Sequence, residues 1–141
     1  MLDLFAGTGA LGLESLSRGA AACLAVDNNK ESLQLIRRNS AACFFTDKLT
    51  PIKRDLRKGL IFLQNFKPAS GFSLVFLDPP YNKELSSKIL EELADGALLA
   101  TQATVIIEED EEVEPPSGAG CLALHDKRTY GETGFWFYTR K

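Results

Sequence analysis

The sequence has no apolar stretch that approaches the roughly 20 residues needed to cross a bilayer. Its first residues also lack the basic region and the small-residue cleavage site of a secretory signal peptide. We therefore predict a cytoplasmic protein without a membrane partner.

Cysteine and histidine are both scarce. The three cysteines are Cys23, Cys43 and Cys121, an odd number scattered among apolar residues. This pattern favours buried free thiols over disulfides or metal ligands, so we assign no metal. The single histidine, His125, falls in an edge-strand pattern and is expected to be a structural or surface residue.

The chain has 141 residues, of which 45% are hydrophobic. This is enough to bury a substantial core, and we predict a single domain over 1–141. The sequence carries no indication of an oligomeric state.

The net charge of −3 is unevenly distributed. Residues 1–70 carry ten Lys/Arg against six Asp/Glu, and residues 71–141 carry six against thirteen. The basic excess is found in Arg37, Arg38, Lys48, Lys53, Arg54, Arg57, Lys58 and Lys67. These residues could contact phosphates, although charge alone favours a solvated face. The acidic run 108–114 would repel nucleic acid, so we expect it in an exposed loop away from any substrate.

Strand-like and helix-like segments alternate along the first three quarters of the chain. After a strand at the start, strands are expected at 23–27, 49–54, 72–77 and 103–107, and helices at 10–18, 30–42, 56–66 and 84–94. This alternation predicts an α/β fold with a mostly parallel sheet and helices on both faces. The runs 121–125 and 135–139 should add an antiparallel hairpin at the sheet edge, which makes seven strands.

A short motif follows the apolar run 72–77: Asp78, Pro79, Pro80 and Tyr81. Two prolines stop a strand abruptly, and a residue before proline is held extended. A carboxylate, a rigid carbonyl and an aromatic ring together suit a flat base that bears an amino group. The tetrapeptide alone fits a plain turn containing two prolines equally well.

A glycine loop lies near the start of the chain, with Gly7, Gly9 and Gly12 at nucleotide-binding spacing. The acidic residue Asp27, 20 positions after Gly7, ends the next strand-like run and can accept hydrogen bonds from ribose hydroxyls. These features fit NAD and S-adenosylmethionine equally. The segment around Asp78 favours methyl transfer, because hydride transfer does not need it and the chain has no obvious second catalytic domain.

Taken together, these features resemble class I S-adenosylmethionine-dependent methyltransferases, which have a Rossmann-like fold. More narrowly, 2–20, 76–81 and 130–133 look like bacterial enzymes that methylate guanine N2 in 16S ribosomal RNA. The resemblance implies S-adenosyl-L-methionine as the cofactor and ribosomal RNA or the assembling small ribosomal subunit as the partner. We expect the chain to correspond to the core of that family without its N-terminal segment.

The resemblance assigns roles to individual residues. The cofactor-binding candidates are Asp3, Phe5, Gly7, Gly9, Asp27, Asn28, Asp55 and Leu56. Asp27 is expected to bind ribose and Asp55 the adenine amino group, although an acid before a helix is also a common cap. Asp3 is either a polar partner of the cofactor or a purely structural acid.

The catalytic candidates are Asp78, Pro79 and Tyr81. Asp78 and the Pro79 carbonyl would accept the two amino hydrogens, and Tyr81 would stack on the base. Two other functions stay open: a DNA or RNA adenine-N6 or cytosine-N4 methyltransferase, and a non-catalytic cofactor-binding module for ribosome assembly. Tyr130, Trp136 and Tyr138 could stack on bases, although aromatic residues in a terminal hairpin more often belong to the core.

Overall fold

The computed structural model describes residues 1–80 and 83–141. The chain forms two compact units, Met1–Leu56 and Arg57–Lys141, which are described separately. Within the described ranges, no helix has the length and apolar character needed to cross a membrane.

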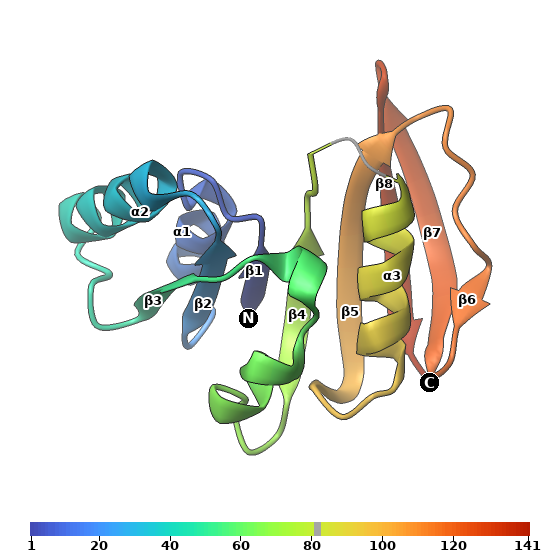
Figure 1. Ribbon diagram of the computed structural model, residues 1–141, viewed down its shortest axis with the longest axis horizontal. Coiled ribbons are helices and arrows are strands. Elements are labelled where there is room, and N and C mark those ends of the chain that lie inside the picture. The colour runs from blue at the N-terminus through green and yellow to red at the C-terminus, as the bar shows by residue number, and fades with distance from the viewer. Residues whose placement is uncertain (81–82) are drawn as a thin grey trace. The chain divides into compact units, whose positions relative to one another are not determined.

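The first unit alternates strands and helices, and its strands are parallel. Its elements are β1 (Leu2–Leu4), α1 (Ala10–Ser17), β2 (Cys23–Asp27), α2 (Lys30–Ala42) and β3 (Leu49–Lys53). The strand order is β3-β2-β1, with Leu2 opposite Leu24 and Cys23 opposite Leu49. Figure 1 shows this unit in blue to blue-green, with both helices beside the strands.

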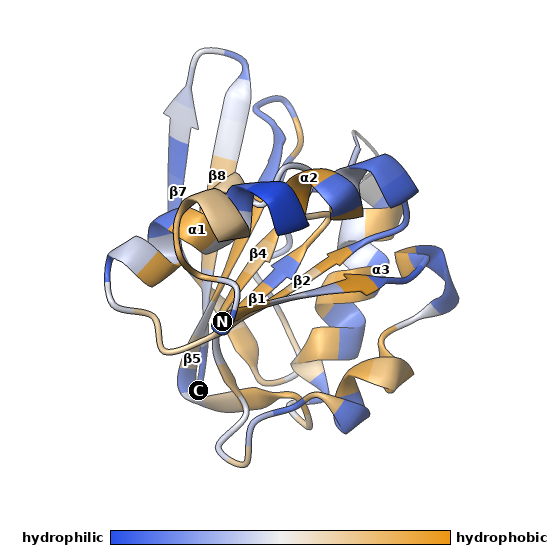
Figure 2. Ribbon diagram, turned by 90° about the vertical axis from the view of Figure 1, so that its left-hand side faces the viewer, coloured by the Kyte–Doolittle hydropathy of each residue, from blue (hydrophilic) through white to orange (hydrophobic). Residues whose placement is uncertain are grey.

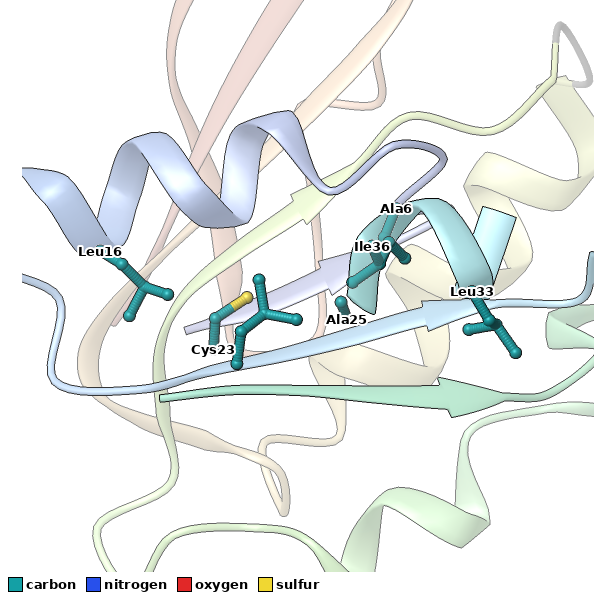
Figure 3. Packing of buried hydrophobic residues seen from close by; sticks show 7 residues of the cluster. Ala6, Leu16, Cys23, Ala25, Leu33 and Ile36 are labelled. Atoms are coloured by element: carbon teal, nitrogen blue, oxygen red, sulfur yellow. The ribbon is translucent and has the colours of Figure 1, made fainter. Parts of the chain in front are cut away.

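A small apolar core joins these helices to the strands. Its members come from the loop after β1, both helices, β2 and β3: Ala6, Leu16, Cys23, Ala25, Leu33, Ile36 and Leu49. Figure 3 shows the side chains of Leu16, Cys23 and Ile36 within this cluster. In Figure 2, β1 and β2 are largely hydrophobic, whereas α2 combines polar and apolar colours. This is the amphipathic pattern of a helix that packs on a sheet by one face.

The second unit contains a parallel pair followed by antiparallel strands. Its elements are the 3-10 helix η2 (Ile61–Asn65), β4 (Phe72–Leu77), α3 (Lys83–Ala94), β5 (Leu99–Asp110), β6 (Gly118–Ala119), β7 (Leu122–Tyr130) and β8 (Thr133–Arg140). The strand order is β4-β5-β8-β7-β6; β4 and β5 are parallel and every later pair is antiparallel. The predicted fold class is therefore confirmed, with β6 as a short strand that was not expected.

One expected helix is absent. The segment 56–66 forms two short 3-10 helices, η1 (Leu56–Lys58) and η2, instead of one continuous helix. Gly59 separates them with a φ of 93°, a left-handed value that an α-helix cannot contain. The helix was expected from the apolar spacing of Leu60, Leu63 and Phe66; Leu60 and Leu63 are buried, but Phe66 is 39% exposed and the glycine interrupts the helix.

The expectation for the acidic run is also wrong. Glu108, Glu109 and Asp110 belong to β5, which is much longer than the predicted 103–107, and Glu109 is only 4% exposed. Pairing with β8 continues as far as Asp110 opposite Thr133, so this backbone is held in the sheet. Only the later part of the run lies beyond the strand.

The predictions for the cysteines are confirmed only in part, whereas those for the aromatic residues of the hairpin and for the hairpin itself can be compared residue by residue. Cys23 is buried as predicted, but Cys43 is exposed because it is the C-terminal cap of α2. Trp136 and Tyr138 belong to the core, at 2% and 0% exposure, whereas Tyr130 is 64% exposed. The predicted hairpin exists, and its strands are longer than expected.

Candidate functional site

The loop between β1 and α1 has the backbone geometry that its glycines permit. Gly7 and Gly9 have φ values of 56° and 82°, and Gly9 caps α1 without a side-chain hydrogen bond. A Cβ on Gly7 would meet no atom within 4 Å, so the loop backbone is open at this point. Gly9 is instead buried, and a Cβ there would stand 3.2 Å from the Ile36 side chain, so the open backbone at the helix N-terminus is that of Gly7, where a ligand could approach closely. Phe5, the other loop candidate, has a φ of 64° and is half-buried.

Asp27 connects β2 to the glycine loop. Its Oδ2 accepts a hydrogen bond from the Gly7 backbone N–H at 2.9 Å, and its Oδ1 accepts from the Asn29 N–H at 2.8 Å. The cap of α2 is Asn29, whose Oδ1 accepts from the Glu31 N–H at 2.8 Å. The carboxylate is therefore not the helix cap, and each oxygen keeps a lone pair for a further donor.

Asp3 lies deeper than the other candidates, at 1% exposure in the middle of β1. Burial, and next the charge of Asp3, raise the pKa of the Cys23 thiol to about 12. Gly12 lies between these groups: a Cβ there would stand 2.7 Å from Cys23 Sγ and 3.7 Å from an Asp3 carboxylate oxygen. The absence of a side chain at Gly12 thus allows α1 to approach the strands, which is the role of the third glycine in a nucleotide-binding loop.

The remaining cofactor candidates follow β2 and β3. Asn28 is exposed directly after Asp27, Asp55 is half-buried, and Leu56 is 2% exposed. The Arg54 N–H donates to the Asp27 carbonyl oxygen at 3.0 Å, which holds the end of β3 beside the end of β2. The first unit therefore brings the glycine loop, Asp27 and the segment that leads to Asp55 to the carboxyl ends of parallel strands, where α/β folds bind ligands.

In the second unit, Asp78 directly follows β4, as the two prolines predicted. Pro79 is buried while Asp78 and Pro80 are exposed. The last strand pair before Asp78 is Leu77 opposite Ile107, so Glu108 is its neighbour on β5. Tyr81, the third catalytic candidate, lies outside the described residues.

The environment of Asp78 disfavours its charged form. Although Asp78 keeps contact with solvent, partial desolvation of its carboxyl, and next the charge of Glu109, raise the pKa of this group above its ordinary value. Burial and the charge of Asp78 also raise the pKa of Glu108. A carboxyl at the end of a strand with a raised pKa can hold a proton more readily than an exposed acid, which is useful where chemistry releases one.

Sequence reasoning missed Glu109. Its Oε2 accepts a hydrogen bond from the Ser86 hydroxyl at 2.7 Å, so a buried carboxylate links β5 to α3. A period-two reading through Val105, Ile107 and Glu109 would have placed this acid on the buried face, since all three are nearly inaccessible.

The raised pKa of Asp78 predicts a pH-dependent effect on stability. The folded-state pKa lies above the unfolded value, so ionisation costs stability; the cost is absent below the unfolded pKa and complete above the folded one. Asp78→Asn should therefore raise the melting temperature at neutral pH and lose that effect as the pH falls toward about 4. Thermal unfolding across this pH range measures it.

Asp126→Asn provides the control of opposite sign. The side-chain hydrogen bond from Arg128 lowers the pKa of Asp126, so its charge stabilises the fold above the unfolded pKa. This variant should be slightly less stable at neutral pH and approach the parent protein in acid. A destabilised Asp78→Asn at neutral pH would contradict the electrostatic account of Asp78.

Comparison with known proteins covers almost the whole chain. Residues 1–139 match the family described as "Conserved hypothetical protein 95". The chain is 34% identical over 140 residues to "Putative rRNA methyltransferase YlbH" of Bacillus subtilis, covering 99% of this chain and 75% of that protein. It is 30% identical over 140 residues to "Ribosomal RNA small subunit methyltransferase D" of Escherichia coli strain K12, covering 99% and 68%.

Solved structures share the fold. A conserved hypothetical protein of Streptococcus pyogenes matches with a TM-score of 0.87 at 32% identity, covering 99% of this chain and 84% of that one. More distant structures, 15% and 14% identical, include a methyltransferase described as S-adenosylmethionine-dependent and an RNA methyltransferase in complex with S-adenosylhomocysteine; they show the fold alone. The fold is that of class I methyltransferases, and S-adenosylmethionine as the predicted cofactor agrees with it.

Proposed function

The chain belongs to the conserved hypothetical protein 95 family of class I methyltransferases, and we propose that it methylates ribosomal RNA of the small subunit at a guanine N2. The methyl donor is S-adenosylmethionine, and the proposal includes the predicted cytoplasmic location. The observation that carries it is the position of Asp78 and Pro79 directly after β4, where a carboxylate and a rigid carbonyl stand together at the carboxyl end of a strand.

In the first unit, residues of the glycine loop bind the cofactor. Gly7 and Gly9 present backbone to its methionyl part, with Asp3 and Phe5 beside the loop. Asp27 accepts from the ribose hydroxyls with the lone pairs that its two backbone bonds leave available. Asn28 directly follows Asp27 after β2, and Asp55 and Leu56 follow β3, where Asp55 accepts from the adenine amino group. Bound S-adenosylmethionine supplies an activated methyl group on a sulfonium.

In the second unit, Asp78 and the Pro79 carbonyl accept hydrogen bonds from the amino group of the target base. Drawing both N–H bonds toward these acceptors frees the nitrogen lone pair for in-line attack. Pro79 has no N–H of its own, so its segment presents acceptors to the base. Tyr81 stacks on the base, which must leave its helix at a cost of a few kcal/mol.

The reaction also releases a proton from the nitrogen. Asp78 is suited to receive it, because burial and the Glu109 charge favour the protonated carboxyl. From Asp78 the proton passes to water, since this side chain is exposed.

The test is methyl transfer from labelled S-adenosylmethionine to three substrates in parallel: small ribosomal subunits, protein-free 16S ribosomal RNA and duplex DNA. Nucleoside analysis of the product should find N2-methylguanine in the ribosomal RNA. N6-methyladenine in DNA as the fastest product would overturn the guanine assignment. Cofactor binding without transfer to any substrate would leave only the non-catalytic module.

A further inference from the structure

One face of the terminal hairpin carries exposed aromatic and basic side chains. Asp126, Arg128 and Tyr130 alternate along β7, and Arg128 pairs with Phe135 while Asp126 pairs with Phe137 on β8. Directly opposite residues of an antiparallel pair share one face of the sheet. These five residues are called the hairpin face below.

Contacts within the hairpin face hold it in one arrangement. The Arg128 guanidinium lies over the Phe137 ring at 5.2 Å and donates from Nε to Asp126 Oδ2 at 2.8 Å. The rings of Tyr130 and Phe135 meet edge to face, with centroids 6.0 Å apart. The two exposed side chains, Tyr130 and Arg128, are therefore held in place by these contacts before any partner binds. This lowers the entropy cost of binding.

The turn beside Tyr130 fixes the end of this face. Tyr130 pairs with Thr133, so only Gly131 and Glu132 form the loop, and Gly131 has a φ of 62°. A two-residue turn with glycine at its first position matches the twist of the strands and leaves little freedom. Tyr130 is nevertheless 64% exposed, and the Arg128 side chain is 59% exposed.

The opposite face of the same hairpin is different. Trp136 and Tyr138 on that face are buried in the core. Lys127, next to Arg128 in sequence, belongs to that side; it pairs with Trp136 across the strands, and its ammonium lies 3.6 Å from Glu114. The aromatic residues that the core needs are thus on one face, and the hairpin face is not part of it.

Register connects the hairpin face to Asp78. Leu77 pairs with Ile107, Glu108 pairs with Phe135, and Phe135 pairs with Arg128. Glu108, Phe135 and Arg128 therefore form one row across β5, β8 and β7, and Asp78, one residue beyond the last pair of β4 with β5, continues the direction of this row. With about 4.8 Å between strands, Arg128 stands roughly 14 Å from Asp78 along this row.

We propose that the hairpin face binds an unpaired nucleotide of the RNA that flanks the methylated base, with its base stacked on Tyr130 and Arg128. The inference rests on the proposed function and adds to it a second point of contact with the substrate. Exposed aromatic rings and guanidinium planes are the groups on which proteins stack single-stranded bases.

Charge decides between stacking and phosphate binding. Arg128 is the single cation of the hairpin face. Its Nε donates to Asp126, and a second acid, Glu108, pairs with Phe135 on the next strand. The face is therefore not positively charged overall, and phosphate pairing would contribute little. We expect the contribution of Tyr130 to be nearly independent of salt.

The experiment measures KM and kcat for methyl transfer to small subunits and to protein-free 16S ribosomal RNA. The variants are Tyr130→Ala, Tyr130→Phe and Arg128→Gln, with Lys127→Gln as the matched control. Arg128→Gln and Lys127→Gln each remove one charge from adjacent residues on opposite faces. Melting temperatures and the KM for S-adenosylmethionine are measured for each variant.

Tyr130→Ala should raise the KM for either RNA substrate roughly 10-fold or more, with little change in kcat, because the face does not touch the reacting atoms. Tyr130→Phe and Lys127→Gln should resemble the parent protein, and Arg128→Gln should fall between. All variants should keep the KM for S-adenosylmethionine.

Four results would overturn the inference: equal KM changes for Arg128→Gln and Lys127→Gln, a Tyr130→Phe defect equal to that of Tyr130→Ala, a change in kcat alone, or a defect seen only with ribosomal particles. The last would assign the face to a ribosomal protein. If the parent protein methylates neither RNA, the proposed function itself fails, which is distinguishable from a parent that is active and insensitive to Tyr130→Ala.

Discussion

Asp78→Ala is expected to lower the rate of methyl transfer by about 100-fold or more while S-adenosylhomocysteine affinity stays within a few fold. The carboxylate acts on the amino group in the transition state and does not bind the nucleoside of the cofactor. Single-turnover kinetics with saturating cofactor, together with calorimetric titration of S-adenosylhomocysteine, separate the two effects.

Asp95→Asn is the matched control, because Asp95 is an exposed carboxylate directly after α3 in the same unit and has no assigned role. It should keep full activity. If Asp78→Ala retained most of the transfer rate, or lost cofactor binding in parallel with it, the assignment of Asp78 to the acceptor base would be wrong.

Asp27→Ala is expected to weaken S-adenosylhomocysteine binding by about 1.5–3 kcal/mol through the loss of charge-assisted bonds to ribose. The same substitution also removes the acceptors of the Gly7 and Asn29 N–H groups, so the loop itself loses stability. Calorimetry gives the affinity, and thermal unfolding without ligand gives the structural part.

Asn29→Ala separates these contributions. It removes the cap of α2 and should cost about 1 kcal/mol of stability, yet it should leave cofactor affinity nearly unchanged. An equal loss of affinity in both variants would mean that Asp27 acts only by holding the loop. Tight NADH binding with no response to S-adenosylhomocysteine would instead favour a dehydrogenase.

Local features of the sequence correctly predicted where most strands and helices lie. Strand β4 ends at Leu77, as the prolines at positions 79 and 80 predicted, because proline cannot donate a hydrogen bond to a neighbouring strand. Leu85, Ile89 and Leu93, whose spacing predicts one face of a helix, are all buried, and α3 ends before Gly96, whose φ is 76°. The predicted helix over 56–66 is wrong, because the left-handed backbone at Gly59 divides the segment into two 3-10 helices.

The acidic run shows that composition alone does not predict burial. Seven residues in which six are acidic predict a solvated loop on composition, yet Glu109 is buried against Ser86. Composition cannot reveal that β8 would extend the ladder to Asp110, because that pairing joins residues more than twenty positions apart. The consequence reaches the site, since the Glu109 charge contributes to the raised pKa of Asp78.

The sequence by itself determined the alternation of strands and helices, the glycine loop, the acid that ends β2 and the Asp-Pro-Pro segment, because backbone restrictions of glycine and proline and apolar periodicity act over a few residues. Only the tertiary structure decided that Asp27 accepts from Gly7, that the Glu109 charge acts on Asp78, and that Tyr130 is exposed while Tyr138 is buried. These outcomes depend on strand register and on packing between distant segments, which set burial and charge proximity. Alternation along one strand indicates which residues share a face, but it does not give the partner strand or the charges that come close.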